Sequence, residues 1–235
     1  MTKQFFHFFS SVILCCCFMA LSGHLVQASD TEFPEDIAKR LQQRYDSMKS
    51  ITFNFNQNTR GEITGKPKTG SGTAAFLKGN SKSKMRWDYL APKRQVLLSD
   101  GLHFFMYFEE LRQMIISPAS SLEKDLTYSF FSGKAQLQND FYIRPADTEL
   151  AGEENSTTNI IKLIPIVPHS QVQDIHLWVS KDSLIHRIHI QDHFGTITVL
   201  NLSNIHTDGL EGKGQAEIDT LFSFTPPEGT EIIQQ

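Results

Sequence analysis

The sequence predicts a mainly β protein with one large antiparallel sheet and helices on one face of it. Two series of about five strand-like segments are separated by a helix-like insert, and a single amphipathic helix precedes them. Short connections join the segments, which is typical of antiparallel neighbours, and the strand–helix alternation of a parallel sheet does not occur. A sheet of about ten strands usually curls or closes on itself.

The first 28 residues are typical of a secretory signal peptide. Lys3 gives a basic start, the apolar run FFHFFSSVILCCCFMAL follows, and the small residues of VQA precede Ser29. Polar residues interrupt the run and no stop-transfer charges follow it, which favours cleavage after Ala28 over a retained anchor. We therefore expect residues 29–235 to form a single soluble domain that is exported to a periplasm.

The composition of the mature chain excludes several classes of function. All three cysteines, Cys15, Cys16 and Cys17, lie in the signal peptide, so neither disulfides nor thiolate metal sites are available afterwards. The LCC context of Cys17 does not suit lipid attachment. Removing the signal changes 22 basic and 26 acidic residues to 21 and 26, a formal charge of −5, which disfavours a nucleic-acid partner.

The first element after the signal is a predicted helix. In FPEDIAKRLQQRYDSMKS, Ile37, Leu41, Tyr45 and Met48 recur at helical spacing, and Pro34 with two acidic residues opens the first turn. The apolar stripe is narrow, so we expect the helix to pack on a sheet by one side only.

The first series of strands begins at Ile51, where the period changes to two. Ile51, Phe53 and Phe55 alternate with polar residues, as in a half-buried strand. Asp100-Gly101 predicts a tight hairpin turn. The further predicted strands are residues 71–78, 84–89, 95–99, 102–108 and 112–116.

The middle of the chain interrupts this rhythm. Residues 117–137 predict one or two short helices, residues 141–144 a return to the sheet, and residues 146–159 an acidic loop. The second series of predicted strands is 158–165, 174–180, 184–191, 196–204 and 221–224, with one helical turn at 216–220. Pro226 and Pro227 require the last strand to end there or to lie at an edge.

The sequence lacks motifs for covalent chemistry. GSG at residues 70–72 lacks the pattern of a nucleophile elbow, and the glycines at 209, 212 and 214 do not form a dinucleotide fingerprint. We therefore expect neither an enzyme nor a bound cofactor.

Five histidines, His176, His186, His189, His193 and His206, gather in the C-terminal half. On a strand, His186 and His189 point to opposite faces, while His189 and His193 lie about 13 Å apart at ~3.3 Å per residue. A metal site would need partners from neighbouring strands, and ordinary strand and loop histidines are favoured.

Large apolar side chains are abundant in the hairpins of the first series. Met85, Trp87 and Tyr89 share one face of a strand, whereas residues 102–108 are apolar on both faces. The predicted helices are small, so the sheet could enclose more apolar lining than the protein itself fills. We infer an apolar cavity whose natural guest is an acyl chain, because each buried CH₂ contributes roughly 0.8 kcal/mol.

The sequence resembles the periplasmic outer-membrane lipoprotein carrier (LolA) family. The resemblance rests on ITFNFNQ, TGSGTAAF, RWDYLAP, LLSDG and FSFTPPEG, together with Tyr107 and Gln113, which occur in the family's order over nearly the whole mature chain. Each motif is weak by itself, and the ordered set after a signal peptide is more specific.

The resemblance implies an open, half-closed β-barrel of about 10–11 strands, with the N-terminal helix and short inserted helices forming a lid over an apolar cavity. It also implies a carrier that takes acylated lipoproteins from an inner-membrane exporter and passes them to an outer-membrane receptor, most simply as a monomer. The candidate cavity lining is Phe55, Trp87, Tyr89, Phe105, Tyr107, Met114 and Ile116. A register slip of one residue would invert these faces.

One departure from the family concerns the lid. Members often carry an Arg-Pro pair whose arginine holds the lid closed, but this chain reads FLKGNSKSKMRW in that region. Lys78, Lys82, Lys84 or Arg86 are the possible substitutes, although lysine lacks the planar fork of arginine.

Two alternative functions stay open at this point. The cavity could carry another periplasmic lipid or a glycolipid, or the domain could sense lipoprotein and dock a regulatory partner. An enzyme is the least favoured, and would require a metal-dependent activity that involves His189 and His193.

Overall fold

The computed structural model describes residues 32–61, 67–79, 82–155 and 157–235; the predicted signal peptide and its cleavage site lie outside these ranges. The first series of strands is β1 (Ser50–Arg60), β2 (Lys68–Leu77), β3 (Lys84–Ala91), β4 (Gln95–Ser99), β5 (His103–Phe108) and β6 (Gln113–Pro118). The second is β7 (Phe141–Pro145), β8 (Thr158–Pro165), β9 (Asp174–Ser180), β10 (Ile185–Gln191), β11 (Ile197–Thr207) and β12 (Glu231–Gln234). The helices are α1 (Pro34–Ser47), the 3₁₀ helix η1 (Ala119–Lys124), α2 (Leu126–Phe131), α3 (Leu137–Asp140), α4 (Thr148–Ala151) and α5 (Gln215–Leu221).

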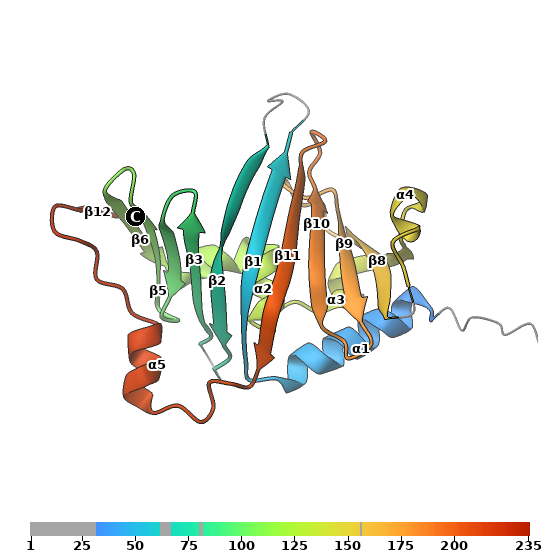
Figure 1. Cartoon of the computed structure of the whole chain (residues 1–235), viewed down its shortest axis with the longest axis horizontal. Helices are drawn as coiled ribbons and strands as arrows, with labels where there is room; N and C mark the ends of the chain where they lie inside the picture. Colours follow the sequence, from blue (N-terminus) through green and yellow to red (C-terminus); the bar gives the residue numbers. More distant parts are fainter. Residues whose placement is uncertain (1–31, 62–66, 80–81, 156) are drawn as a thin grey trace, which may run out of the picture. The chain divides into compact units, whose positions relative to one another are not determined.

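All of these strands belong to one sheet, in the order β12-β6-β5-β4-β3-β2-β1-β11-β10-β9-β8-β7 (Figure 1). Neighbours are antiparallel except β12 and β6, which run parallel. The sheet does not close, because β12 and β7 are its two free ends. This confirms the predicted mainly β, half-open architecture, with twelve strands in place of the expected 10–11.

The strand predicted at residues 221–224 is wrong. Leu221 ends α5, and the backbone N–H of Phe222 donates to the carbonyl of Ile218, so it is not free to join a ladder. The last strand is β12, which the sequence analysis missed. The apolar alternation that suggested a strand has another cause: Phe222 is buried beside α5, and Phe224 packs on Tyr107.

Helix α1 forms as predicted. Pro34 occupies the first turn with Glu35 and Asp36, where acidic side chains complement the helix dipole. Its buried side chains are Ile37, Ala38, Leu41 and Tyr45. They face α3, β7 and β8, so one side of the helix covers the sheet and the other meets solvent.

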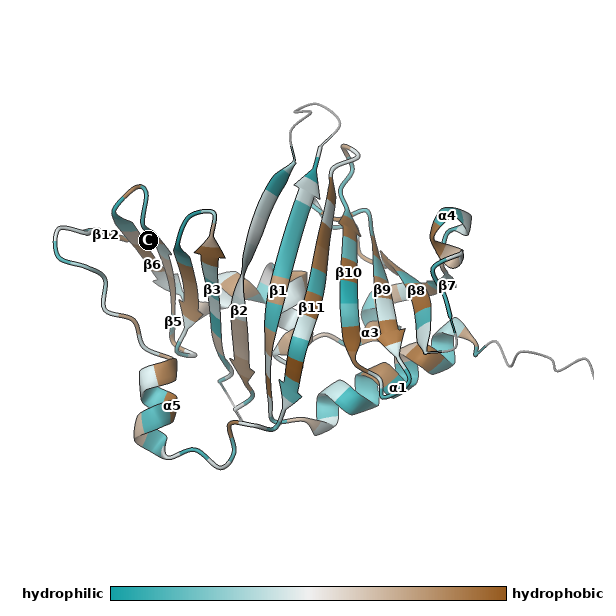
Figure 2. Cartoon of the chain, viewed as in Figure 1, coloured by the Kyte–Doolittle hydropathy of each residue, from teal (hydrophilic) through white to brown (hydrophobic). Residues whose placement is uncertain are grey.

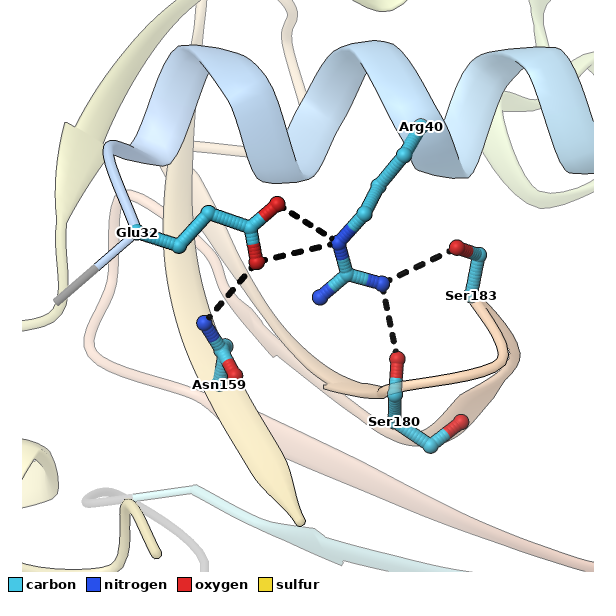
Figure 3. Close-up of polar contacts among 5 residues, drawn as sticks. All are labelled: Glu32, Arg40, Asn159, Ser180 and Ser183. Atoms are coloured by element: carbon cyan, nitrogen blue, oxygen red, sulfur yellow. Dashed lines mark hydrogen bonds and ion pairs between the residues drawn. The ribbon is translucent and has the colours of Figure 1, made fainter. Parts of the chain in front are cut away.

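A polar cluster fastens the N-terminal half of α1 to the sheet (Figure 3). The Arg40 Nε donates to both carboxylate oxygens of Glu32 at 2.8 and 3.1 Å. Its Nη1 donates to the Ser180 carbonyl at 2.8 Å and to the Ser183 hydroxyl at 2.9 Å. Asn159 of β8 also donates to Glu32. The guanidinium therefore ties α1 to the turn between β9 and β10, and Glu32 links it to β8.

The register divides the sheet into two faces, because directly paired residues point to the same side. We call the face that carries Phe53, Trp87 and Leu177 the inner face; it forms the main core with α1, α2 and α3. On the opposite, outer face, α5 and the chain after it cover small apolar clusters around Ala75 and Tyr107. Bands of hydrophobic and hydrophilic residues accordingly alternate along β10 and β11 (Figure 2).

Candidate functional site

A cavity of about 1400 Å³ lies between the inner face and the chain from η1 to α3. Strands β1 to β5, β10 and β11 supply its wall, and the loop after β8, residues 166–171, supplies part of its edge. The volume exceeds the ~300–1000 Å³ of ordinary small-molecule pockets. The cavity therefore suits a guest larger than a typical metabolite.

The wall formed by the first series of strands is apolar and aromatic. Phe76, Met85, Trp87, Leu97 and Phe104 line the cavity from four adjacent strands. Their faces agree because Phe76 pairs with Met85 and Trp87 pairs with Leu97. Such a surface binds hydrocarbon by removing it from water, without directional contacts.

Of the seven predicted lining residues, Trp87 and Tyr89 reach the cavity. Phe55 lies beside them on the inner face, across Gly72 of β2: its ring centroid is 4.6 Å from that of Trp87 and 4.9 Å from that of Tyr89. Phe55 is 1% exposed and so supports the wall from the core.

The other four predicted residues, Phe105, Tyr107, Met114 and Ile116, lie on the outer face, away from this cavity. Phe105 pairs with Leu98, which in turn pairs with Arg86, so it points opposite to Trp87. The residues of β5 that share the inner face with Trp87 are therefore displaced by one position from the predicted ones. Phe224 packs against this outer-face cluster, with its ring centroid 5.0 Å from that of Tyr107.

One end of the wall carries hydrogen-bonding side chains that we call the polar strip: Gln57, Thr59, Trp87, Tyr89 and Thr198. The Tyr89 hydroxyl donates to Gln57 Oε1 at 2.7 Å, and Gln57 Nε2 donates to Thr59 Oγ1 at 3.2 Å. The Thr59 and Thr198 hydroxyls lie 3.1 Å apart. Burial raises the pKa of Tyr89, so its hydroxyl stays protonated and remains a donor.

Trp87 joins this strip through its indole. The side chain is 6% exposed, and its buried Nε1–H interacts with the Tyr89 hydroxyl, which offsets part of the rise that burial causes in the pKa of Tyr89.

The edge of the cavity is charged. Glu123 and Lys134 form an ion pair at 3.0 Å, and both contribute to the lining. Asp125 caps α2 by accepting from the Tyr128 backbone N–H at 2.7 Å, and Asp140 accepts from the Gln136 N–H. These groups stabilise the short helices and make the entrance of the cavity polar, while the wall behind them is apolar.

Lys78 connects the sheet to the helical cover. Its Nζ donates to the carbonyl of Tyr45 in the last turn of α1. It also lies against the turn after α2, where a Cβ on Gly133 would come 3.0 Å from Lys78 Cε. Lys84 and Arg86 lie on the outer face instead. They contact α5, and Arg86 also donates to the carbonyl of Ser223 just beyond that helix. Among the four basic residues considered as lid contacts, Lys78 is the one with a hydrogen bond to α1 in the described residues.

Tyr45 ties the same region together from α1. Its hydroxyl accepts the backbone N–H of Ile185 at 3.2 Å, and its ring centroid is 4.6 Å from that of Phe130. Helices α1 and α2 therefore move only if these contacts break.

Two of the histidines lie together on the outer face. His176 and His189 pair across β9 and β10 with ring centroids 5.6 Å apart. His176 Nε2 lies 3.3 Å from Asp147, and Lys162 binds the same carboxylate at 2.7 Å. Within the described ranges, no three histidine, cysteine or acidic side chains are arranged to hold a metal ion. The Lys162 ammonium pairs with both acidic groups there, Asp147 and Asp174.

His193 takes no part in this cluster. Its Nε2 lies 2.9 Å from the His169 carbonyl in a loop contact.

Several lining residues escaped the sequence analysis. Leu97 was hidden because β4 is apolar at successive positions, so its faces could not be distinguished. Leu122 and Leu126 of the helical insert stand four residues apart, and this spacing was the available signal for an apolar helical side. Ile166 and Val167 lie in a loop without periodicity.

None of the helices in the described residues is both long and apolar enough to cross a membrane.

The chain is similar to known proteins over most of its length. A family model described as outer membrane lipoprotein carrier protein LolA matches residues 46–225. The outer-membrane lipoprotein carrier protein of Methylococcus capsulatus is 26% identical over 195 residues, covering 83% of this chain and 86% of that protein. The protein of the same description from Nitrosomonas europaea is 26% identical over 188 residues, covering 79% and 84%.

A solved structure supports the fold. An uncharacterized conserved protein from Thermus thermophilus matches 86% of this chain and 98% of its own, with a TM-score of 0.50 and 12% identity. The open sheet with a cavity on its inner face, and a family model that spans more than half of the sequence, lead to one conclusion. The chain belongs to the outer membrane lipoprotein carrier (LolA) family.

Proposed function

We propose that this protein shields the acyl chains of lipoproteins in its cavity and carries them through the periplasm from the inner to the outer membrane. The family is one of periplasmic, non-enzymatic lipoprotein carriers. The observation that carries the proposal is the cavity of about 1400 Å³ with an aromatic and aliphatic wall on the inner face. Burial of each CH₂ group there contributes roughly 0.8 kcal/mol.

The physical logic requires no reaction. A donor at the inner membrane delivers the lipoprotein, and a receptor at the outer membrane removes it because the receptor binds the same acyl chains more favourably. The signal peptide at residues 1–28 is part of this proposal, because it places the mature chain between the two membranes.

The cargo contacts belong to the same proposal. Trp87 and Tyr89 contact the guest directly, and Phe55 holds their rings in place. Phe105, Tyr107, Met114 and Ile116 contribute to the fold of the outer face, beneath Phe224. Lys78 keeps α1 over the sheet and must release Tyr45 when the cover opens.

Mass spectrometry of protein purified from cells, with depletion in the same organism, tests the proposal. We expect co-purified acylated lipoprotein, and lipoproteins retained in the inner membrane after depletion. Free phospholipid or glycolipid as the sole bound material, with lipoproteins still correctly sorted, would assign the cavity to another lipid. A protein that never contains lipid would refute the carrier function.

A further inference from the structure

The two most exposed large apolar side chains in the described part of the chain lie close together. Val167, in the loop after β8, is 78% exposed, and Phe194, in the turn between β10 and β11, is 74% exposed. The two segments are in contact, because His193 Nε2 lies 2.9 Å from the carbonyl oxygen of His169. With their exposed neighbours these side chains form a patch that we call the apolar tip, which consists of Ile166, Val167, Pro168 and Phe194.

The fold itself does not require apolar side chains at the apolar tip. Asp192 Oδ1 accepts the backbone N–H groups of Phe194 and Thr196 at 2.8 Å each, so the backbone of Phe194 holds this turn. Ile166 likewise donates its backbone N–H to the carbonyl of Asp140, while its side chain is 39% exposed. Adjacent exposed apolar side chains without a role in packing are typical of an interaction surface.

The apolar tip is continuous with the edge of the cavity. Ile166, Val167 and Pro168 belong to the cavity lining as well as to the exposed surface. Ile190 of β10 also lines the cavity and comes four residues before Phe194 in the chain. A surface that binds the apolar tip therefore faces the edge of the cavity.

Positive charge flanks the apolar tip. Arg60 ends β1 and pairs with Ile197, at the start of the strand that follows Phe194. Lys68 begins β2 and pairs with Thr59 of β1. Both cationic side chains are exposed, and neither forms an ion pair with another described residue. They are available to anionic groups, although the chain as a whole has a formal charge of −4.

We propose that the apolar tip and its flanking cations bind the surface of an anionic lipid bilayer. Phe194 and Val167 enter the boundary between headgroups and acyl chains, while Arg60 and Lys68, at the strand ends behind them, pair with lipid phosphates. Apolar burial and attraction to anionic lipids are the two contributions that hold a protein at this boundary. The order of the side chains, with the apolar ones at the turns and the cations behind, matches hydrocarbon beneath phosphate and favours a bilayer over a protein groove. The inference goes beyond the proposed carrier function, in which proteins act at both membranes.

A fluorescent reporter tests whether the apolar tip enters the bilayer. The mature chain contains two tryptophans, Trp87 and Trp178, and both are buried. In Phe194→Trp, we expect the emission to shift to shorter wavelength with vesicles of phosphatidylglycerol and phosphatidylcholine, and to be quenched by lipids brominated near the headgroup. The matched control is Leu102→Trp, at a position that is 55% exposed in the turn between β4 and β5, at the opposite end of the sheet. Emission that stays unshifted at position 194, or equal shifts at the two positions, would overturn the inference.

Co-sedimentation with the same vesicles measures the apolar contribution. We expect Val167→Ser with Phe194→Ser to weaken vesicle binding by the exported protein roughly tenfold or more, because it removes the side chains that leave water. Leu102→Ser should bind as the unaltered protein does. Binding of a hydrophobic dye to the cavity should stay unchanged in both variants, so the result is independent of the carrier function. Unweakened vesicle binding in the double variant, or no vesicle binding by the unaltered protein, would overturn the inference.

Charge variants test the preference for anionic lipid. We expect Arg60→Gln with Lys68→Gln to weaken binding to the phosphatidylglycerol vesicles roughly tenfold or more at low ionic strength. Added salt should weaken binding by the unaltered protein in the same direction. Lys181→Gln, an exposed cation in the turn between β9 and β10 at the opposite end of the sheet, is the matched control. Equal affinity of the unaltered protein for anionic vesicles and for vesicles of phosphatidylcholine alone would overturn the inference.

Discussion

Phe55 contributes to the cavity through packing alone. It is buried between Trp87 and Tyr89, with which its ring makes close aromatic contacts. We expect Phe55→Ala to lower the free energy of unfolding by about 3–5 kcal/mol, because it removes a buried ring and leaves a void. Urea denaturation measures this, and Phe194→Ala, at a position that is 74% exposed, should change stability by less than about 0.5 kcal/mol. Similar effects of the two substitutions would contradict the supporting role.

His176 and His189 make stability sensitive to mild acid. Burial lowers the pKa of both side chains below the value of about 6.5 that an unfolded chain gives them. Their contribution to stability is complete above that value, and it is lost as the pH falls below it toward the lower folded pKa values, because the unfolded chain binds protons first. We therefore expect the free energy of unfolding to fall between pH 7 and pH 5.

A double variant isolates this effect. The charged side chains that face the two rings are Asp147, Glu153, Lys162, Asp174 and Arg187. Because the two imidazoles are the groups whose pKa values burial lowers in this cluster, His176→Gln with His189→Gln should flatten the urea-derived stability profile between pH 5 and pH 7. A profile as steep as that of the unaltered protein would locate the acid sensitivity elsewhere.

For single residues, the sequence shows the periodicity of apolar side chains along a strand. It does not show which other segment covers each face of that strand. Trp87 was placed correctly because charged residues alternate with it along β3. Residues 104–108 are apolar at every position, so periodicity could not choose a face for Phe105. The outer-face cluster on which Phe105 packs also includes Phe224, which is distant in the sequence. Such a long-range contact leaves no local pattern.

At the scale of elements, α1 is attached at two places with different roles. Arg40 anchors its first half to β8 and to the turn after β9. We expect Arg40→Met to cost about 1–3 kcal/mol, since it removes the ion pair with Glu32 and the hydrogen bonds to the Ser180 carbonyl and the Ser183 hydroxyl. Amide hydrogen exchange within α1 should increase correspondingly. Lys39→Met, an exposed neighbour on the same helix, serves as the control, and equal exchange in the two variants would disprove the anchor.

Lys78 holds the other end of α1, near its C-terminus. Removal of its ammonium in Lys78→Met leaves the Tyr45 carbonyl without this contact. We expect faster hydrogen exchange in the last turn of α1 and in α2, and stronger binding of a hydrophobic dye to the cavity. Lys84→Met, which loses a contact to Asp219 on the outer face, is the matched control. Unchanged dye binding in Lys78→Met would show that this contact does not close the cover.

Most elements could be predicted from sequence, and the failures have a common cause. The strands of the two series follow from alternation and turn residues, and α1 follows from its apolar spacing. The chain after α5 failed because LFSFTPP alternates like a strand while its backbone caps a helix. The parallel pairing of β12 with β6 arises only when the folded sheet offers an unpaired edge.

At the scale of the whole sheet, the free volume of the cavity is the functional quantity. Leu97 lines the cavity from β4 and is partly exposed within it. We expect Leu97→Trp to fill this space and reduce co-purified lipid several-fold, while far-ultraviolet circular dichroism stays unchanged. Leu90→Trp adds the same ring at a site that is 62% exposed and should leave bound lipid unaffected. Equal lipid content in the two variants would exclude this part of the cavity from cargo binding.

The strand order also determines when the sheet can be completed. Strand β1 lies at its centre, where Phe55 pairs with Leu202 of β11, so the first and almost the last strands of the chain must meet there. Pairings between such distant segments form slowly, because the intervening chain loses conformational entropy before the stabilising contacts between the strands are made. When the chain becomes available for folding from its N-terminal end, β1 can pair with β2 at once, but its pairing with β11 requires nearly the whole chain. Until then it presents an unpaired edge prone to aggregation, at the position that becomes the middle of the finished sheet.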